Sequence, residues 1–97
     1  MYDQGKGVAQ DDKAAASWFL KSAEQGDAGA QLTLGVMYVK GNGAIQNYIQ
    51  AHKWWNISVA NGNESARRNR DRVAKLMTPS QLEKAQALAR KWLASHK

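Results

Sequence analysis

The chain has 97 residues, with 14 Lys and Arg against 8 Asp and Glu, so its net charge is +6 and its length predicts one domain. A hydrophobic content of 43% with 23% charged residues is ordinary for a globular protein and excludes a disordered one. Because there is no cysteine, a disulfide scaffold, an iron–sulfur site, a thiolate zinc site and a cysteine nucleophile are all excluded.

The sequence shows no targeting or membrane-spanning segment. The longest apolar run covers residues 14–20 and is interrupted by Ser17, whereas a membrane span needs about 20 apolar residues. The first residues have neither the basic start nor the apolar stretch of a signal peptide. We therefore expect a soluble chain, cytoplasmic or periplasmic depending on a targeting segment that this sequence does not contain.

The chain repeats itself with a period of 36 residues. Glycine, aromatic and alanine positions coincide after the shift: Tyr2 with Tyr38, Gly5 with Gly41, Gly7 with Gly43, Trp18 with Trp54, Gly26 with Gly62 and Ala30 with Ala66. A fixed period of this length is typical of helical repeat proteins. We predict one domain, 1–97, made of a partial repeat at 1–26, a complete repeat at 27–62 and a C-terminal helix pair at 63–97.

The partial repeat predicts a helix over about residues 11–25. Asp11 and Asp12 would lie at its start, where carboxylates cap the free N–H groups and favour the helix dipole. Trp18 is assigned to the core. Because Tyr2 corresponds to Tyr38, near the end of a first helix, we interpret this repeat as truncated. Its uncapped side is expected to expose apolar surface, which a second copy of the chain would cover in a homodimer.

The complete repeat predicts two helices. Asp27 caps the first, at about 28–40, and the glycines Gly41 and Gly43 end it. Gly35 inside this helix costs roughly 1 kcal/mol relative to alanine, so we expect the neighbouring helix to approach it closely.

The second helix of the complete repeat covers about residues 47–61. Asn47 caps it with Gln50 as a capping-box partner, and Gly62 ends it. Its buried side is predicted to carry Ala51, Trp54, Trp55 and Ser58. Trp54 is assigned to the core. One ring of the adjacent pair Trp54 and Trp55 is expected to reach the surface or the seam between repeats. His52 is placed on the solvent-exposed side.

These residues resemble a known family. The pattern Ala30-x-x-x-Leu34-Gly35-x-x-Tyr38-x-x-Gly41-x-Gly43, followed by Ala51-x-x-Trp54-Trp55-x-x-Ser58, is similar to the Sel1-like repeat, a relative of the tetratricopeptide repeat. The resemblance implies an all-α fold, a right-handed α-solenoid of about five helices arranged as Sel1-like and tetratricopeptide-like pairs. It also implies a protein–protein interaction scaffold or adaptor, which binds a protein or peptide in the groove lined by the first helix of each pair.

The C-terminal third predicts helices at about 64–77 and 79–95. Asn63 is expected to cap the former, and Thr78 caps the latter with Pro79 at the first helical position and Gln81 reaching back. An apolar stripe along the last helix includes Trp92, which is assigned to the core. The segment resembles the terminal capping pair of Sel1-like proteins, whose outer face is polar because no further repeat covers it.

The whole excess of positive charge lies in residues 63–97, and its strongest feature is the run Arg67-Arg68-Asn69-Arg70-Asp71-Arg72. We interpret this run first as a solvated helix with local salt bridges. The second interpretation is a contact for an acidic partner through Arg67, Arg68, Arg70 and Arg72. Nucleic acid comes third, since no aromatic residue is interleaved with the arginines.

The chain lacks a recognisable catalytic constellation. His52 and His96 are its only histidines, and no cluster has the spacing of metal ligands. The Gly5-x-Gly7 and Gly41-x-Gly43 pairs are explained by the repeat rather than by phosphate binding. Some cysteine-rich Sel1-like relatives are linked to β-lactam binding or hydrolysis, but the cysteines are absent here. We expect no catalytic activity, no cofactor and no metal, with a β-lactam-hydrolysing enzyme and a nucleic-acid binder as alternatives to the scaffold.

Overall fold

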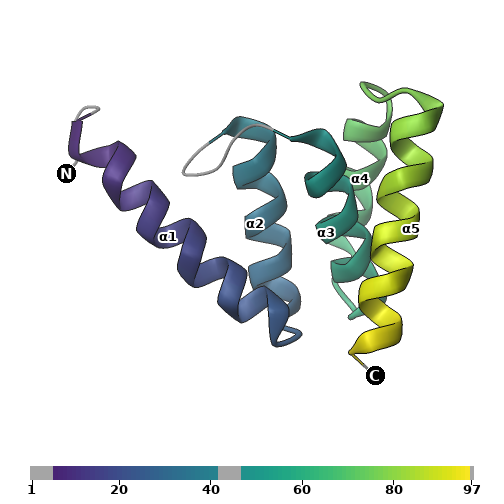
Figure 1. Ribbon diagram of the computed structural model, residues 1–97, viewed down its shortest axis with the longest axis horizontal. Coiled ribbons are helices and arrows are strands. Elements are labelled where there is room, and N and C mark those ends of the chain that lie inside the picture. The colour runs from purple at the N-terminus through teal and green to yellow at the C-terminus, as the bar shows by residue number, and fades with distance from the viewer. Residues whose placement is uncertain (1–5, 42–46, 97) are drawn as a thin grey trace.

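The computed structural model describes residues 6–41 and 47–96, and for residues 6–12 it describes the backbone alone (Figure 1). The described ranges contain no strand, which confirms the all-α prediction. Five helices follow in chain order: α1 (Lys6–Glu24), α2 (Ala28–Lys40), α3 (Tyr48–Ala60), α4 (Ser65–Ala74) and α5 (Pro79–Ser95).

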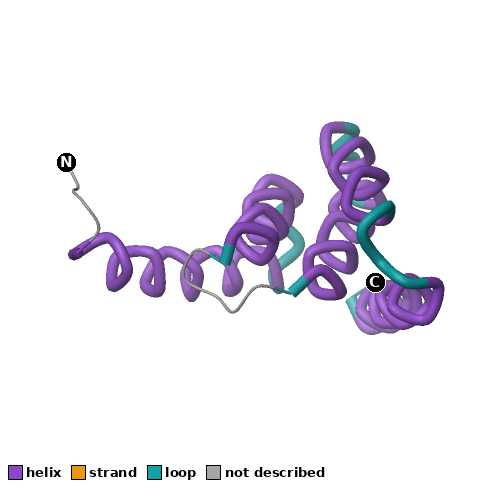
Figure 2. The backbone as a smooth tube through the Cα atoms, turned by 90° about the horizontal axis from the view of Figure 1, so that it is seen from above, coloured by secondary structure: helices purple, strands orange, loops and turns teal. Residues whose placement is uncertain are grey.

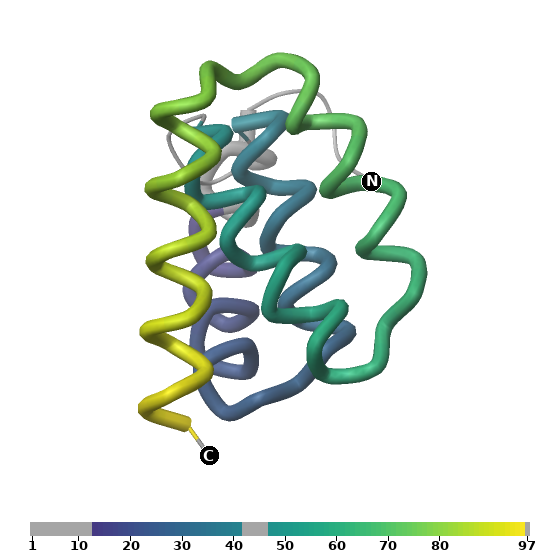
Figure 3. Tube along the Cα trace, turned by 90° about the vertical axis from the view of Figure 1, so that its right-hand side faces the viewer, coloured from purple at the N-terminus to yellow at the C-terminus, as the bar shows by residue number. Residues whose placement is uncertain are grey.

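The helices stack side by side along the chain, as in a solenoid. α2 packs between α1 and α3, and α3 packs against α2, α4 and α5. Seen from above, α2 and α4 lie on one side of the stack and α5 lies on the other (Figure 2). Viewed from the C-terminal side, α3 runs between α4 and α5 (Figure 3). α3 is therefore the central helix, and α4 and α5 each pack against it.

Side-chain caps set most helix starts as the sequence predicts. Asp27 Oδ1 accepts a hydrogen bond from the Ala30 N–H at 3.0 Å, and Asn47 Oδ1 accepts one from Gln50 N–H at 3.0 Å. The predicted capping box at Asn47 is only half formed, because the Asn47 N–H donates to Tyr38 O at 3.0 Å rather than to the Gln50 side chain. The reciprocal capping box of Thr78 and Gln81 is complete, with bonds of 3.1 and 2.9 Å. Each cap satisfies backbone donors that the first helical turn leaves free.

The start of α4 differs from the prediction. α4 begins at Ser65 after Glu64, whose side chain makes no capping bond. Asn63 Oδ1 instead accepts from the Ser65 N–H at 3.0 Å. Asn63 therefore closes a turn just before the helix. Its side-chain oxygen accepts from the N–H two residues later, whereas Asp27, Asn47 and Thr78 accept from the N–H three residues later.

The two turns that end the second helices have the same backbone geometry 36 residues apart. Gly26 and Gly62 have φ values of 96° and 98°, a region that glycine enters without a steric penalty. Asp27 N–H donates to Ser22 O at 3.2 Å, and Asn63 N–H donates to Ser58 O at 3.0 Å. The internal repeat seen in the sequence is thus a structural repeat.

α1 starts earlier than predicted, at Lys6 rather than near residue 11. Gly7 therefore lies within the helix instead of ending a loop, and Asp11 and Asp12 do not mark its start. A single glycine weakens a helix by about 1 kcal/mol without stopping it, so the helix extends through residues 8–10. Tyr2, Gly5 and Gly43 lie outside the described residues.

Two clusters of buried side chains form the core. The first joins α1, α2, α3 and α5 and contains Ala23, Ala30, Leu34, Trp54, Ile57, Ala89 and Trp92. The second joins α2, α3, α4 and α5 and contains Ala51, Trp55, Ala66, Val73, Met77 and Ala85. The rings of Trp54 and Trp92 meet edge to face with centroids 5.8 Å apart, so both tryptophans lie in the core as predicted.

Trp18 is not a core residue, and its prediction is wrong. Its side chain is 63% exposed, whereas Trp54, 36 residues later, is 1% exposed. Trp54 is covered by α2 and α5, whereas Trp18 belongs to neither core cluster and its ring meets that of Phe19, at 5.3 Å between centroids. Two equivalent sequence positions therefore have different environments, because the described chain has no helix over Trp18 that corresponds to α2.

Candidate functional site

A groove opens between α2 and α4, the first helices of two successive pairs, with α3 beneath it. Its volume is about 220 Å³. The residues that line it are Val36, Val39 and Lys40 from α2, Trp55 from α3, and Asn69, Arg72, Val73 and Leu76 from α4 and the turn after it. The groove therefore lies on the side of the stack where the family resemblance implies partner binding.

The indole of Trp55 forms the floor of this groove and is held in a fixed position. Its Nε1–H donates to Leu32 O at 2.9 Å. The ring lies directly against Gly35, where any side chain would occupy the same space. The expected close approach at Gly35 is confirmed, and the predicted seam position among the two adjacent tryptophans belongs to Trp55, which is itself buried.

The walls of the groove are apolar and its rim is basic. Leu76 is 62% exposed at the edge of these apolar walls. Lys40 and Arg72 are exposed on opposite walls. Among the described residues that line the groove, none is acidic.

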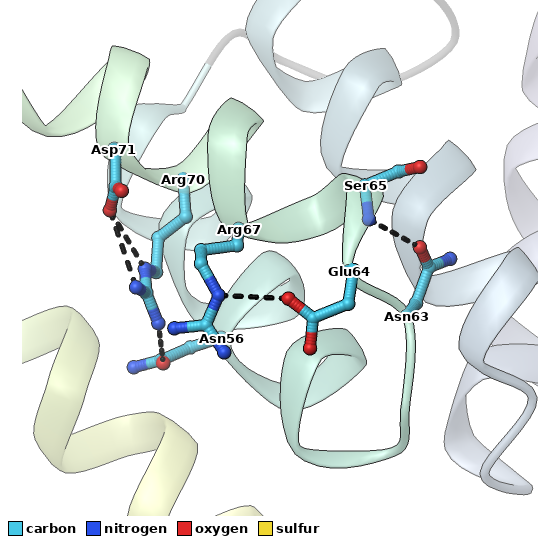
Figure 4. Close-up of polar contacts among 7 residues, drawn as sticks. All are labelled: Asn56, Asn63, Glu64, Ser65, Arg67, Arg70 and Asp71. Atoms are coloured by element: carbon cyan, nitrogen blue, oxygen red, sulfur yellow. Dashed lines mark hydrogen bonds and ion pairs between the residues drawn. The ribbon is translucent and has the colours of Figure 1, made fainter.

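The structure divides the arginine run into two groups. Arg67 Nε donates to Glu64 Oε1 at 3.0 Å, and this contact lowers the pKa of the Glu64 carboxyl (Figure 4). Arg70 donates to Asn56 Oδ1 at 3.0 Å and to Asp71 Oδ1 at 3.3 Å (Figure 4). These two arginines follow the first interpretation, local salt bridges on a helix surface.

Arg68 and Arg72 form the second group. Both are exposed, and within the described chain neither side chain makes a hydrogen bond or ion pair. Arg72 lines the groove. Arg68 lies one helical turn earlier on the same side of α4. The four predicted contacts for an acidic partner are therefore not brought together: Arg72 reaches the groove, and Arg67 and Arg70 are engaged elsewhere.

His52 is buried, and its predicted exposure is wrong. The residue is 3% exposed, and its Nδ1 has no hydrogen-bond partner among the described residues. Burial, with Arg70 nearby, lowers the pKa of the imidazole. The reason is the central place of α3, which α2, α4 and α5 surround. A signal in the sequence was available, because residues 48–60 contain one charged side chain, Lys53, as expected for a helix covered on most sides.

His52 also lines a second cavity, of about 340 Å³, between α3, α4 and α5. Arg70 and Asp71 contribute a paired positive and negative charge to it, beside the polar Asn56 and Gln86. The charges cancel, so this cavity has no clear preference for an anion or a cation.

A polar cluster joins the ends of α1 and α5, and sequence reasoning did not find it. Trp92 Nε1–H donates to Glu24 Oε1 at 2.9 Å across 68 residues of sequence. The imidazole of His96 stacks on the Trp92 ring with centroids 3.7 Å apart, and its Nε2 lies 3.6 Å from Glu24 Oε1. Contacts between side chains so far apart in sequence leave no local pattern.

The described part of the chain contains no group of three or more His, Cys, Asp or Glu side chains that could bind a metal. None of the helices in that part has both the length and the apolar character needed to cross a membrane. The repeat positions Ala30, Leu34, Gly35, Ala51 and Trp54 are buried.

Comparison with known proteins agrees with this geometry. The Sel1 repeat family matches residues 1–27 and 28–63. No curated protein matches the chain. The chain is similar to the crystal structure of c5321, a protective antigen present in uropathogenic Escherichia coli strains that displays an SLR fold, with 37% identity and a TM-score of 0.86.

That similarity covers 96% of this chain and 20% of c5321, so the chain spans about a fifth of the length of that protein. The two helix pairs, the glycine turns repeated 36 residues apart and the two family matches agree. A scaffold that binds proteins is consistent with this fold. The chain belongs to the Sel1 repeat family.

Proposed function

We propose that this chain is a protein-interaction module that binds a segment of a partner protein in the groove between α2 and α4. The observation that carries the proposal is the apolar groove itself, in which Leu76 remains 62% exposed at the edge of a floor formed by Trp55. Exposed apolar surface with a polar rim is typical of binding sites. The proposed role is binding without catalysis.

Site-specific photo-crosslinking tests this function. A p-benzoylphenylalanine placed at Leu76 lies in the groove, and one placed at the exposed Ala87 of α5 is the matched control. In the cells that produce the protein, we expect a defined adduct from position 76 and none of the same mass from position 87. The same adducts from both positions, or none from either, would contradict the proposal.

Self-association through α1 is a second proposal, carried by the exposed ring of Trp18. Trp18 is 63% exposed and Leu20 is 38% exposed, and a second copy of the chain would cover both in a two-fold contact. Sedimentation equilibrium should show a monomer–dimer equilibrium that Trp18→Gln weakens. A monomer at every concentration would contradict it.

A further inference from the structure

We propose that the segment bound in the α2–α4 groove is acidic and carries one large apolar anchor residue. This inference rests on the proposed function and names the chemistry of the partner. Three features lead to it: the size of the groove, its charge, and the availability of the Arg72 side chain when two other arginines of the same helix have partners.

The size of the groove fits a side chain rather than a small-molecule ligand. Pockets for such ligands measure about 300–1,000 Å³ and enclose most of the molecule, whereas this groove measures about 220 Å³ and is open. Val36, Val39 and Val73 form its walls. A single leucine, phenylalanine or tryptophan side chain would fill it and remove the exposed surface of Leu76 from water.

The charge of the groove selects an acidic segment. Lys40 on one wall and Arg72 on the other are exposed, and among the described residues neither side chain has a hydrogen-bond or ion-pair partner. The C-terminal ends of α2 and α4 lie here, and each contributes about half a negative charge. Two full positive charges outweigh these partial charges, and the exposed Lys75, which does not line the groove, adds positive charge at the end of α4. The rim therefore attracts carboxylates on both sides of the anchor.

The same geometry leaves the side chain of Arg72 available while those of Arg67 and Arg70 have partners. Arg67 is engaged by Glu64, and Arg70 is engaged by Asn56 and Asp71. Their positive charges are already partnered, so they add little to the attraction for a bound acidic segment. Arg68 is exposed as well, but it does not line the groove. Arg72 lines the groove and its side chain is available, so it is the one of the four arginines expected to determine binding.

A nucleic acid does not fit the groove. Single-stranded nucleic acids are bound by exposed aromatic rings on which bases stack, whereas the indole of Trp55 at the floor of the groove is only 4% exposed and is held against Gly35. The other apolar side chains that line the groove are aliphatic. A peptide with an aliphatic or aromatic anchor matches it better.

Selection from a displayed library of random 12-residue peptides tests the inference. The bait is the 97-residue chain, and the counter-selection bait is Asn69→Trp, whose new side chain fills the groove without changing its charge. Circular dichroism establishes that both baits are folded. We expect peptides that bind the wild type and not Asn69→Trp to be rich in Asp and Glu around a single Leu, Phe or Trp.

A pair of double variants then measures the contribution of charge. For a selected peptide labelled with fluorescein, Lys40→Gln with Arg72→Gln should weaken binding about tenfold, the effect of two partly desolvated ion pairs. The control, Arg67→Gln with Lys84→Gln, removes the same net charge away from the groove and should change the affinity less than about twofold. Equal losses in the two double variants would overturn the inference, because general attraction would explain them.

The selection separates this inference from the function on which it rests. Groove-dependent peptides without an acidic excess would support the proposed function and overturn the acidic partner. An absence of groove-dependent peptides would overturn both. Binding of a fluorescein-labelled oligonucleotide that competes with the selected peptides would overturn the assignment to a peptide.

Discussion

The indole ring of Trp55 occupies the space that a side chain on Gly35 would need. A methyl group at position 35 would lie 2.6 Å from Cδ1 and Cε2 of that ring. The same ring donates from its Nε1–H to Leu32 O on the facing helix. One glycine therefore allows α2 and α3 to approach closely and fixes the floor of the groove.

Gly35→Ala is expected to destabilise the protein although alanine favours helices. The gain in helix propensity is about 1 kcal/mol. Displacing the indole costs about 1–3 kcal/mol in an overpacked core, and about 1 kcal/mol more if its hydrogen bond is lost. We expect a net loss of about 1–2 kcal/mol in urea denaturation. In a Trp55→Leu background the same substitution should be neutral or stabilising, and an equal loss in both backgrounds would contradict the contact.

The two repeat-equivalent tryptophans should respond differently to truncation. Trp54 is 1% exposed, so Trp54→Ala should cost about 3–5 kcal/mol, which approaches the stability of a small domain. Trp18 is 63% exposed, so Trp18→Ala should change the free energy of unfolding by no more than about 0.5 kcal/mol in the monomer. Thermal and urea melts followed by circular dichroism measure both. Similar losses at the two positions would mean that Trp18 is covered in solution.

His52 is expected to make the protein less stable in mild acid. Burial and the nearby Arg70 lower the pKa of this imidazole in the folded protein, whereas the unfolded chain has the ordinary value of about 6.5. Between the two values the unfolded chain binds the proton more strongly, so stability is full above pH 6.5 and falls as the pH drops below it. The loss can reach about 1.4 kcal/mol per pH unit in that window.

His52→Gln is the matched variant for this prediction. It keeps a polar side chain at the position but cannot titrate, so comparing the two proteins isolates the contribution of the imidazole at position 52. The difference in stability between the wild type and the variant should shift in favour of the variant from pH 7.5 to pH 5. A constant difference across this range would show that His52 titrates as it does in the unfolded chain.

Hydrogen exchange should be uneven along α1. This helix packs chiefly on α2, and its end is fixed by Ala23 in the core and by the bond from Trp92 to Glu24. Amides of residues 13–18 have few buried neighbours and should exchange faster than those of residues 48–60 in the surrounded α3. Equal protection of the two segments in a confirmed monomer would show that α1 is stabilised in another way.

The local features of this fold were predictable from sequence because their causes lie within a few residues. Asp27, Asn47 and Thr78 cap helices through bonds to N–H groups three residues along. Gly26 and Gly62 end helices through their own backbone conformation. The predicted start of α1, near residue 11, was wrong because a glycine favours the interruption of a helix without requiring it.

The sequence by itself determined the helix pairs, the 36-residue repeat and the family, since these depend on periodicity and on short-range hydrogen bonds. The tertiary structure decided the environment of each functional side chain. Trp18 and Trp54 share a repeat position, yet only Trp54 has helices on both sides. His52 is buried because three helices meet around α3. Arg72 faces the groove while Arg70 is bound to Asn56, fourteen residues away. Burial and charge pairing depend on which distant segments come together, and a local pattern does not contain that information.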